Sequence, residues 1–253
     1  MTDRQAAGPQ DAPATAPAYY AARQGRWRDW WTLLHPPYTA WHLSYVVIGA
    51  CLAPTVTLVP LLWTLGAFFL AVGVAAHALD ELHGRPLRTR IPSSALVAVT
   101  VVALAGALGF GVYGVIRVGW TLVPFMVAGP LLVILYNAEL LHGLVHNDIG
   151  FAAAWGSFPV LTAYVAETGQ LAVAPVLAAG AALGISAAQR SLSTPARLLR
   201  RKTGSASGQV VLADGTVIEL DKARLLAPLE HALRALSWGM VLLAAALAVA
   251  RLR

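Results

Sequence analysis

Apolar residues occur along this chain in long continuous runs, and polar residues gather in the short segments between them. A run of roughly 20 apolar residues is long enough to cross a bilayer as a helix. Strands of a membrane barrel would instead alternate with a period of two. The pattern predicts an all-α fold, a polytopic transmembrane helical bundle of about seven spans. The expected spans are 41–57, 60–82, 93–115, 118–138, 149–167, 170–190 and 227–250.

The N-terminal residues before the first run differ in composition from the runs. Residues 1–22 are rich in alanine, proline and polar residues, which predicts a disordered tail without the apolar core of a signal peptide. Residues 23–40 combine arginine with tryptophan, a mixture that favours the headgroup layer of a membrane. We therefore expect an interfacial segment at 23–40 and a transmembrane core over 41–190.

The longest polar loop covers 191–226 and precedes the last transmembrane helix, which we expect within 227–253. Two stretches rich in β-branched residues flank Asp214 and Gly215 in this loop. An Asp-Gly pair between such stretches is a strong hairpin signal. We expect a short β-hairpin on the cytoplasmic side, acting as a connector or as a lid.

Basic residues are distributed unevenly among the segments between spans, and this predicts an orientation. The positive-inside rule places the N-terminus and the three most basic segments in the cytoplasm, and the C-terminus outside, in a bacterial-type cytoplasmic membrane. The terminal Ala-Arg-Leu-Arg is an exception that argues weakly against this orientation. The three groups are Arg23, Arg26 and Arg28; Arg85, Arg88 and Arg90; and Arg190, Arg197, Arg200, Arg201 and Lys202.

Composition supports a membrane protein and narrows its chemistry. The chain is 58% hydrophobic and 12% charged, whereas soluble domains are about 25% charged. The net charge of +6 suits basic inner loops and does not by itself imply nucleic acid. We expect a membrane lipid or isoprenoid as partner and no nucleic acid. The sequence has no Walker-type phosphate loop, no nucleophile elbow and no Cys-x-x-Cys pair, which removes support for nucleotide hydrolysis, serine hydrolysis and dithiol chemistry.

The first polar constellation lies at the end of the second expected span. On a helix, His77, Asp80 and Glu81 share one face. Ionisable groups near the ends of membrane helices are costly unless they face a cavity or a partner, so they are functional candidates. The arginines of the following loop, Arg85, Arg88 and Arg90, are candidates for binding phosphate.

The second constellation lies between Tyr136 and Phe151. Glu139, His142 and His146 share a face if this segment is helical, and Asp148 follows them. Carboxylates and imidazoles at these spacings hold Mg²⁺, Mn²⁺, Zn²⁺ or Fe²⁺. We expect the two constellations to meet in one cleft with a metal or diphosphate site. The simpler alternative is that polar residues gather at helix ends because the headgroup region is wet.

Several short stretches resemble the UbiA superfamily of intramembrane prenyltransferases, over roughly residues 41–190. "HLSYVVIGACLAP" is similar to the first helix of that family, and "TRIPSSAL" to the start of its third helix. Tyr136-Asn137 stands where the family commonly has Tyr-Ser. The stretch "NDIGFAAAWGSFPVLTAYVAETG" resembles the fifth helix of the menaquinone-branch members, through Asp148, Gly156, Tyr164, Thr168 and Gly169.

The resemblance implies a bundle of about nine helices with two aspartate-rich motifs on the cytoplasmic side. In that family the motifs hold Mg²⁺, which binds the diphosphate of an isoprenoid donor, and the allylic cation then alkylates an acceptor or cyclises. Tyr136 and Tyr164 would line the tunnel for the isoprenoid chain. Asp80 matches the last aspartate of the first motif, but Ala76 and Val72 occupy its other two positions.

The second aspartate-rich motif is absent, because the stretch after the sixth expected span, "AAQRSLSTPARLLRRKTG", contains no carboxylate. Its polar residues, Gln189, Arg190, Ser191, Ser193 and Thr194, are candidates for contact with phosphate. The basic run at Arg197, Arg200, Arg201 and Lys202 either holds an anionic headgroup directly or is ordinary positive-inside charge, which is the simpler interpretation.

Three functions remain open from the sequence. The first is a divergent UbiA-type membrane enzyme for prenyl transfer or cyclisation, with Mg²⁺ held by Asp80, Glu81 and Asp148. The second is a metal-dependent lipid oxidoreductase or hydrolase on the same scaffold, with Fe or Zn as cofactor. The third is a non-catalytic lipid- or quinone-binding membrane protein. The metal ligands in the second case would be His77, Asp80, Glu81, Glu139, His142 and His146.

Overall fold

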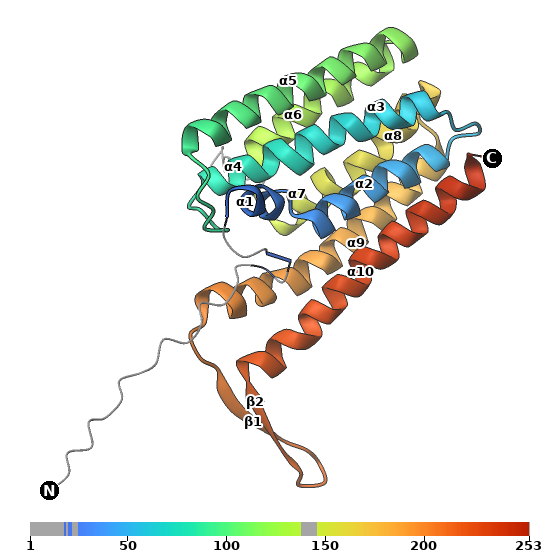
Figure 1. Cartoon of the computed structure of the whole chain (residues 1–253). Helices are drawn as coiled ribbons and strands as arrows, with labels where there is room; N and C mark the ends of the chain where they lie inside the picture. Colours follow the sequence, from blue (N-terminus) through green and yellow to red (C-terminus); the bar gives the residue numbers. More distant parts are fainter. Residues whose placement is uncertain (1–17, 19, 22–24, 138–145, 253) are drawn as a thin grey trace, which may run out of the picture.

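The computed structural model describes residues 18, 20–21, 25–137 and 146–252, and these form a bundle of helices that run back and forth along one axis, with one β-hairpin (Figure 1). The helical elements are α1 (Arg26–Leu33), α2 (Pro36–Cys51), α3 (Leu58–Phe68), η1 (Phe69–Ala76), α4 (His77–Leu82), α5 (Ser93–Val118), η2 (Trp120–Leu122), α6 (Val123–Asn137), α7 (Asp148–Ala152), η4 (Ala153–Ser157), α8 (Phe158–Thr168), α9 (Val173–Arg197), η5 (Leu198–Lys202) and α10 (Lys222–Arg251). The hairpin consists of β1 (Ser207–Val211) and β2 (Val217–Asp221).

Six helical stretches of the described chain are long and apolar enough to cross a membrane, which is consistent with the expected multi-pass helical bundle. Helix α2 has 16 residues and, at 1.5 Å per residue, a length of about 24 Å. It packs against α8 and α10 as a shorter seventh helix. The six stretches are Leu58–Leu82, Ser93–Val118, Trp120–Asn137, Asp148–Thr168, Val173–Lys202 and Lys222–Arg251.

Three expected helix boundaries need correction. Helix α2 begins at Pro36 rather than at residue 41, because proline is pre-organised for the first helical turn. Helix α9 and η5 continue to Lys202, so the start of the expected loop is helical. Helix α10 begins at Lys222, where the Asp221 carboxylate accepts a hydrogen bond from the Arg224 N–H at 2.7 Å and caps the helix.

The connecting segments gather at two opposite ends of the bundle. At one end, Arg251 of α10 donates to the carbonyls of Ala53 and Pro54, and Glu167 accepts from the N–H and hydroxyl of Thr57 at 3.1 Å. At the other end, the carboxylate of Asp29 in α1 accepts from the Arg90 N–H at 2.9 Å. The N-terminal segment and the loop after α4 therefore share an end that lies opposite the C-terminus, as the charge pattern predicts.

The expected hairpin is present around Asp214 and Gly215. The strands pair antiparallel from Ser207 opposite Asp221 to Val211 opposite Val217. Gly215 has a φ of 86°, and the Asp214 side chain accepts from the Thr216 N–H at 2.9 Å, which closes the turn. The hairpin extends away from the helices beyond the ends of α9 and α10 (Figure 1).

Small residues set the closest helix contacts in the bundle. A Cβ atom on Gly49 of α2 would lie 2.2 Å from the Val160 carbonyl oxygen of α8, a distance that real atoms do not adopt. A Cβ on Gly156 of η4 would similarly lie 2.5 Å from the Ser186 hydroxyl of α9. Close approach of helices at glycine is a usual source of stability in membrane bundles.

We predict that Gly49→Ala destabilises the protein, because the added methyl group forces α2 and α8 apart. Overpacking costs about 1–3 kcal/mol, which corresponds to a fall of about 3 to 10 °C in the unfolding midpoint. Gly184→Ala in α9 is the matched control, since a Cβ there meets nothing within 4 Å. Thermal unfolding of the detergent-solubilised variants measures both, and equal midpoints would contradict the close contact.

Candidate functional site

A cavity of about 290 Å³ opens at the end of the bundle that carries Asp29 and the loop after α4. We call it the basic cavity. Its apolar lining includes Val72, Ala76, Phe151 and Trp155. Its polar and ionisable lining residues are Tyr20, His35, Tyr38, His42, His77, Asp80, His83, Tyr136, Asn137, His146, Gln189, Arg190, Ser193, Arg197, Arg200, Arg201 and Glu230.

Three π-helical turns contribute side chains to this cavity. Val72 and Ala76 belong to η1, Trp155 belongs to η4, and Arg200 and Arg201 belong to η5. A π-helical turn contains one residue more than an α-helical turn, and such turns occur frequently at functional sites. Their convergence on one cavity indicates that the local helix geometry is adapted to shape it.

Four arginines from α9 and η5 give the basic cavity a positive charge. Arg190, Arg197, Arg200 and Arg201 line it together with two carboxylates, Asp80 and Glu230. Glu230 of α10 forms an ion pair with Arg200, which neutralises one of the four. The described lining therefore holds more cations than anions and favours an anionic ligand.

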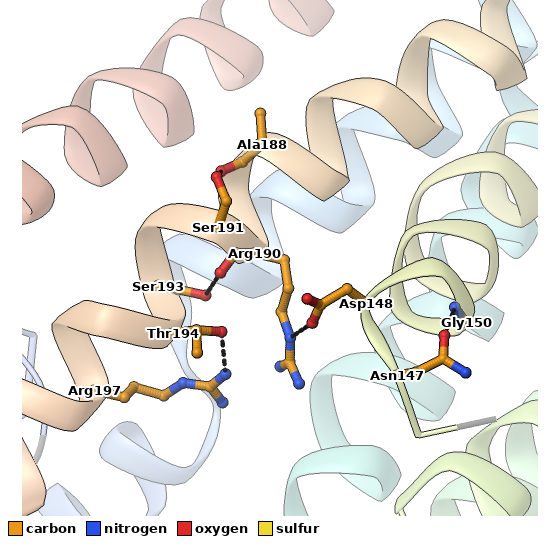
Figure 2. A network of polar contacts seen from close by, with 9 residues as sticks. All are labelled: Asn147, Asp148, Gly150, Ala188, Arg190, Ser191, Ser193, Thr194 and Arg197. Carbon is orange, nitrogen blue, oxygen red and sulfur yellow. Dashed lines mark hydrogen bonds and ion pairs between the residues drawn. The ribbon is translucent and has the colours of Figure 1, made fainter. Parts of the chain in front are cut away.

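The positive charge of Arg190 is partly balanced by Asp148, a residue that does not line the cavity. Its Nε donates to Asp148 Oδ1 at 2.9 Å, but the Asp148 side chain is 71% exposed, so water screens this pair. Figure 2 shows the guanidinium groups of Arg190 and Arg197 extending from α9 into the same space, with Asp148 approaching from the start of α7. Arg197 contacts the Thr194 hydroxyl of its own helix at 3.4 Å.

Two buried polar groups of the basic cavity have no hydrogen-bond partner among the residues that the structure describes. They are the hydroxyl of Tyr136 and the side-chain oxygen of Gln189, each in a side chain that is 4% exposed. Buried polar groups are nearly always hydrogen-bonded. A donor and an acceptor left without a partner beside four arginines indicate that a polar ligand or water completes this site.

Histidines form the side of the cavity nearest to the N-terminal segment. His35 stacks on His77 with 4.3 Å between ring centres, and the Tyr20 hydroxyl hydrogen-bonds to His35 Nδ1. Burial, followed by the neighbouring His77, lowers the pKa of His35 well below its usual value, so this ring is neutral at pH 7. His77 Nδ1 donates to the Gly73 carbonyl at 3.0 Å, which leaves Nε2 as an acceptor in the neutral ring.

The structure places Glu81 in a different role from the metal-binding one expected. Its carboxylate is fully buried and accepts from the Leu87 N–H at 2.9 Å and from the Thr89 N–H and hydroxyl at 2.8 Å each. The loop that it holds contains Arg85 and Arg88 at positive φ. Glu81 does not line the basic cavity, and its carboxylate holds the loop after α4 in place.

The loop arginines also lie away from the basic cavity, contrary to the expected phosphate contact. Arg85 donates to the Ile91 carbonyl and to the Ser93 hydroxyl at the start of α5. Arg88 and Arg90 are exposed and do not line the cavity. The cations that face it come from the end of α9 instead, where the second aspartate-rich motif of the UbiA pattern would lie.

The other candidate residues divide into three groups. His77, Asp80, Tyr136 and His146 line the basic cavity, and the ends of the second and fourth expected spans therefore meet there. Tyr164 is buried and does not line it. Glu139 and His142 lie outside the described residues.

Within the described part of the chain, no group of three His, Cys, Asp or Glu side chains is arranged to hold a metal ion. Of the two described carboxylates that line the basic cavity, Glu230 pairs with Arg200, whereas Asp80 has no ion pair. Asp80 is thus the remaining acidic group on the cavity wall.

Sequence reasoning missed the contribution of the N-terminal segment. Tyr20, His35 and Tyr38 line the basic cavity, although the sequence of this region is typical of a membrane anchor. The signal available was His35 directly before Pro36-Pro37, since a proline pair fixes the start of α2 and thereby the position of His35.

No family model, no curated protein and no solved structure matches this chain.

We predict that Glu81→Gln lowers stability by about 2 kcal/mol or more, because an amide NH₂ would then face backbone N–H donors. Thermal unfolding measures the loss, and hydrogen exchange at the Leu87 and Thr89 amides should accelerate. Asp80→Asn is the matched control, because the carboxylate of Asp80 is next to Glu81 in the sequence but lines the cavity. A Glu81→Gln protein with unchanged midpoint and unchanged exchange would contradict the loop-fixing role.

Proposed function

We propose that this chain is a multi-pass membrane enzyme that binds the diphosphate headgroup of an isoprenoid lipid in the basic cavity and catalyses prenyl transfer or cyclisation. The observation that carries the proposal is the set of four arginines beside the unpartnered Tyr136 hydroxyl and Gln189 amide, in a cavity with an apolar wall. The resemblance to UbiA prenyltransferases favours the isoprenoid diphosphate over other anionic lipids.

Arginine suits this ligand because its planar guanidinium forms paired hydrogen bonds with phosphate oxygens. Arg197 and Arg201 both line this cavity, one from the last turn of α9 and the other from η5. The Tyr136 hydroxyl can donate to a phosphate oxygen, whereas Gln189 can turn its amide NH₂ toward one. These groups would fix the headgroup at the end of α9.

In the proposed reaction, the bond between the allylic carbon and the diphosphate oxygen breaks, and its electron pair leaves with the diphosphate. Cationic groups aimed at the leaving oxygen stabilise the negative charge that develops there. The allylic cation would lie toward the apolar wall, where the aromatic rings of Tyr136 and Trp155 pack edge to face with 5.7 Å between centres. Aromatic faces attract cations.

The described residues do not fit the two-metal site that the UbiA resemblance implies. Such a site needs two clusters of aspartates, but the described residues of the cavity wall offer Asp80 alone besides the paired Glu230. We therefore assign neutralisation of the diphosphate charge to the arginines of α9 and η5. The alternative of a His-ligated Fe or Zn enzyme depends on Glu139 and His142, which lie outside the described residues.

We predict that Arg197→Gln and Arg201→Gln each weaken binding of geranylgeranyl diphosphate about tenfold or more, because each removes a charge-assisted hydrogen bond. Binding and diphosphate release are measured on the purified protein in lipid nanodiscs. Arg88→Gln is the matched control, since it removes the same charge at the same end of the bundle but outside the cavity.

Three outcomes of this experiment would count against the proposal. Equal losses in Arg88→Gln and Arg197→Gln would assign the effect to general surface charge. Binding without release of diphosphate, with or without Mg²⁺, would identify a non-catalytic lipid-binding protein. Stoichiometric iron or zinc in the purified protein would favour the metal-dependent alternative.

A further inference from the structure

A second cavity lies inside the bundle between α3, α5, α6 and α8, and we call it the apolar cavity. Its volume is about 70 Å³, and its wall includes Ala67, Gly111, Met126 and Phe158. Gly111, Met126 and Phe158 keep partial exposure, so the cavity lies close to the lipid-facing side of the bundle. Each of these four helices belongs to one of the stretches long and apolar enough to cross a membrane.

Two polar side chains in this wall lack partners. Trp63 is 7% exposed and Thr64 is 3% exposed, and both line the apolar cavity. The indole N–H of Trp63 and the hydroxyl of Thr64 have no hydrogen-bond partner among the residues that the structure describes. Leaving a buried donor without a partner destabilises the folded state by about 1–3 kcal/mol. Both of these groups lie within a candidate membrane span.

The hydroxyl of Thr64 lacks the hydrogen bond to its own helix that other hydroxyls of the bundle form. A serine or threonine in a helix ordinarily donates to the carbonyl four residues earlier. Thr100 donates in this way to Leu96 at 2.9 Å, and Thr162 donates to Phe158 at 2.7 Å. Thr162 lines the same cavity as Thr64, so the surroundings do not prevent this bond in general. The Thr64 hydroxyl is instead left available.

We propose that the apolar cavity is a binding site for an apolar lipid that carries a hydrogen-bond-accepting oxygen, of the class of isoprenoid ketones. The two unpartnered groups are both donors, and a carbonyl oxygen can accept from either of them. The cavity volume is several times the ~10–15 Å³ that a cavity needs to hold one water molecule. It holds a carbonyl group with its adjacent carbons, while the remaining chain lies among the surrounding helices or lipids.

The apolar cavity adjoins the basic cavity. Val72 of η1 and Trp155 of η4 line both of them, so these two side chains form the partition. The ligand could be a separate membrane lipid or the far end of a lipid whose headgroup occupies the basic cavity, and the chemistry that Trp63 and Thr64 recognise is the same. The inference rests on different side chains from the proposed function, and either can fail alone.

The test uses two probes that differ only in oxygen: geranylacetone, and the hydrocarbon obtained by replacing its carbonyl with a methylene. Each is titrated into the full-length protein in lipid nanodiscs, and its affinity is derived from the rise in the unfolding midpoint. We expect the wild-type protein to prefer the ketone about tenfold, as one net hydrogen bond provides. Equal affinities for the two probes would overturn the proposal.

Two substitutions that remove the donor groups locate the effect. The Trp63→Phe, Thr64→Val double variant should lose the preference for the ketone and bind the hydrocarbon as before. Thr162→Val is the matched control, because its hydroxyl lines the same cavity but is already bonded. It should keep the preference. A double variant that still prefers the ketone, or a Thr162→Val variant that loses the preference equally, would overturn the assignment.

The ligand-free proteins supply a second readout. If the two donors lack partners, Thr64→Val removes a buried polar group without breaking a bond, so the unfolding midpoint should stay equal or rise. A lower midpoint would mean that a buried water satisfies the hydroxyl, and the proposal would fail.

Displacement of geranylacetone by geranylgeranyl diphosphate, but not by inorganic diphosphate, would identify one continuous lipid site. Undisturbed ketone binding would identify two sites, and both results support the proposal.

Discussion

Like charges held together near a bilayer repel one another and resist desolvation, and this constraint shapes the end of the bundle around the four arginines of α9 and η5. Glu230 of α10 neutralises Arg200, and Asp148 of α7 reaches Arg190 from the exposed rim. Arg197 and Arg201 line the same wall, so the described lining holds four arginines and two carboxylates. In the proposed function, an anionic headgroup would add the negative charge that this mostly cationic wall favours.

The packing of the bundle keeps this cavity in place. Gly49 brings α2 against α8, and Gly156 brings η4 against α9, and of these elements α2, η4 and α9 contribute side chains to the cavity wall. The buried Glu81 carboxylate fixes the loop that leads from α4 to α5. Three π-helical turns then adjust the side chains that face inward. Rigid packing and local helix irregularity therefore cooperate to position one site.

The positions of the helices and of the hairpin could be predicted from the sequence, because span length and Asp-Gly turn chemistry are local properties. The role of Glu81 could not, because its partners at Leu87 and Thr89 depend on a loop with two residues at positive φ. Similarly, Arg88 and Arg197 look alike in a sequence, and only the path of the chain decides which one faces a cavity. His77 and Asp80 both line the basic cavity as their spacing on one helix predicts, since a helix fixes the direction of its side chains.

The two cavities differ in what they leave unsatisfied, and this difference separates their ligands. The described lining of the basic cavity has more arginines than carboxylates, and its Tyr136 hydroxyl and Gln189 side-chain oxygen lack partners among the described residues, which suits the charged headgroup proposed for it. The apolar cavity has two uncharged donors, which match a neutral oxygen. Because Val72 and Trp155 separate the two, an apolar chain that passes this partition would have a charged end at the membrane surface and a neutral end at mid-bundle. Such a lipid would offer acceptor oxygens to the hydroxyl of Tyr136 and to the donors of Trp63 and Thr64, which no purely hydrocarbon chain can do.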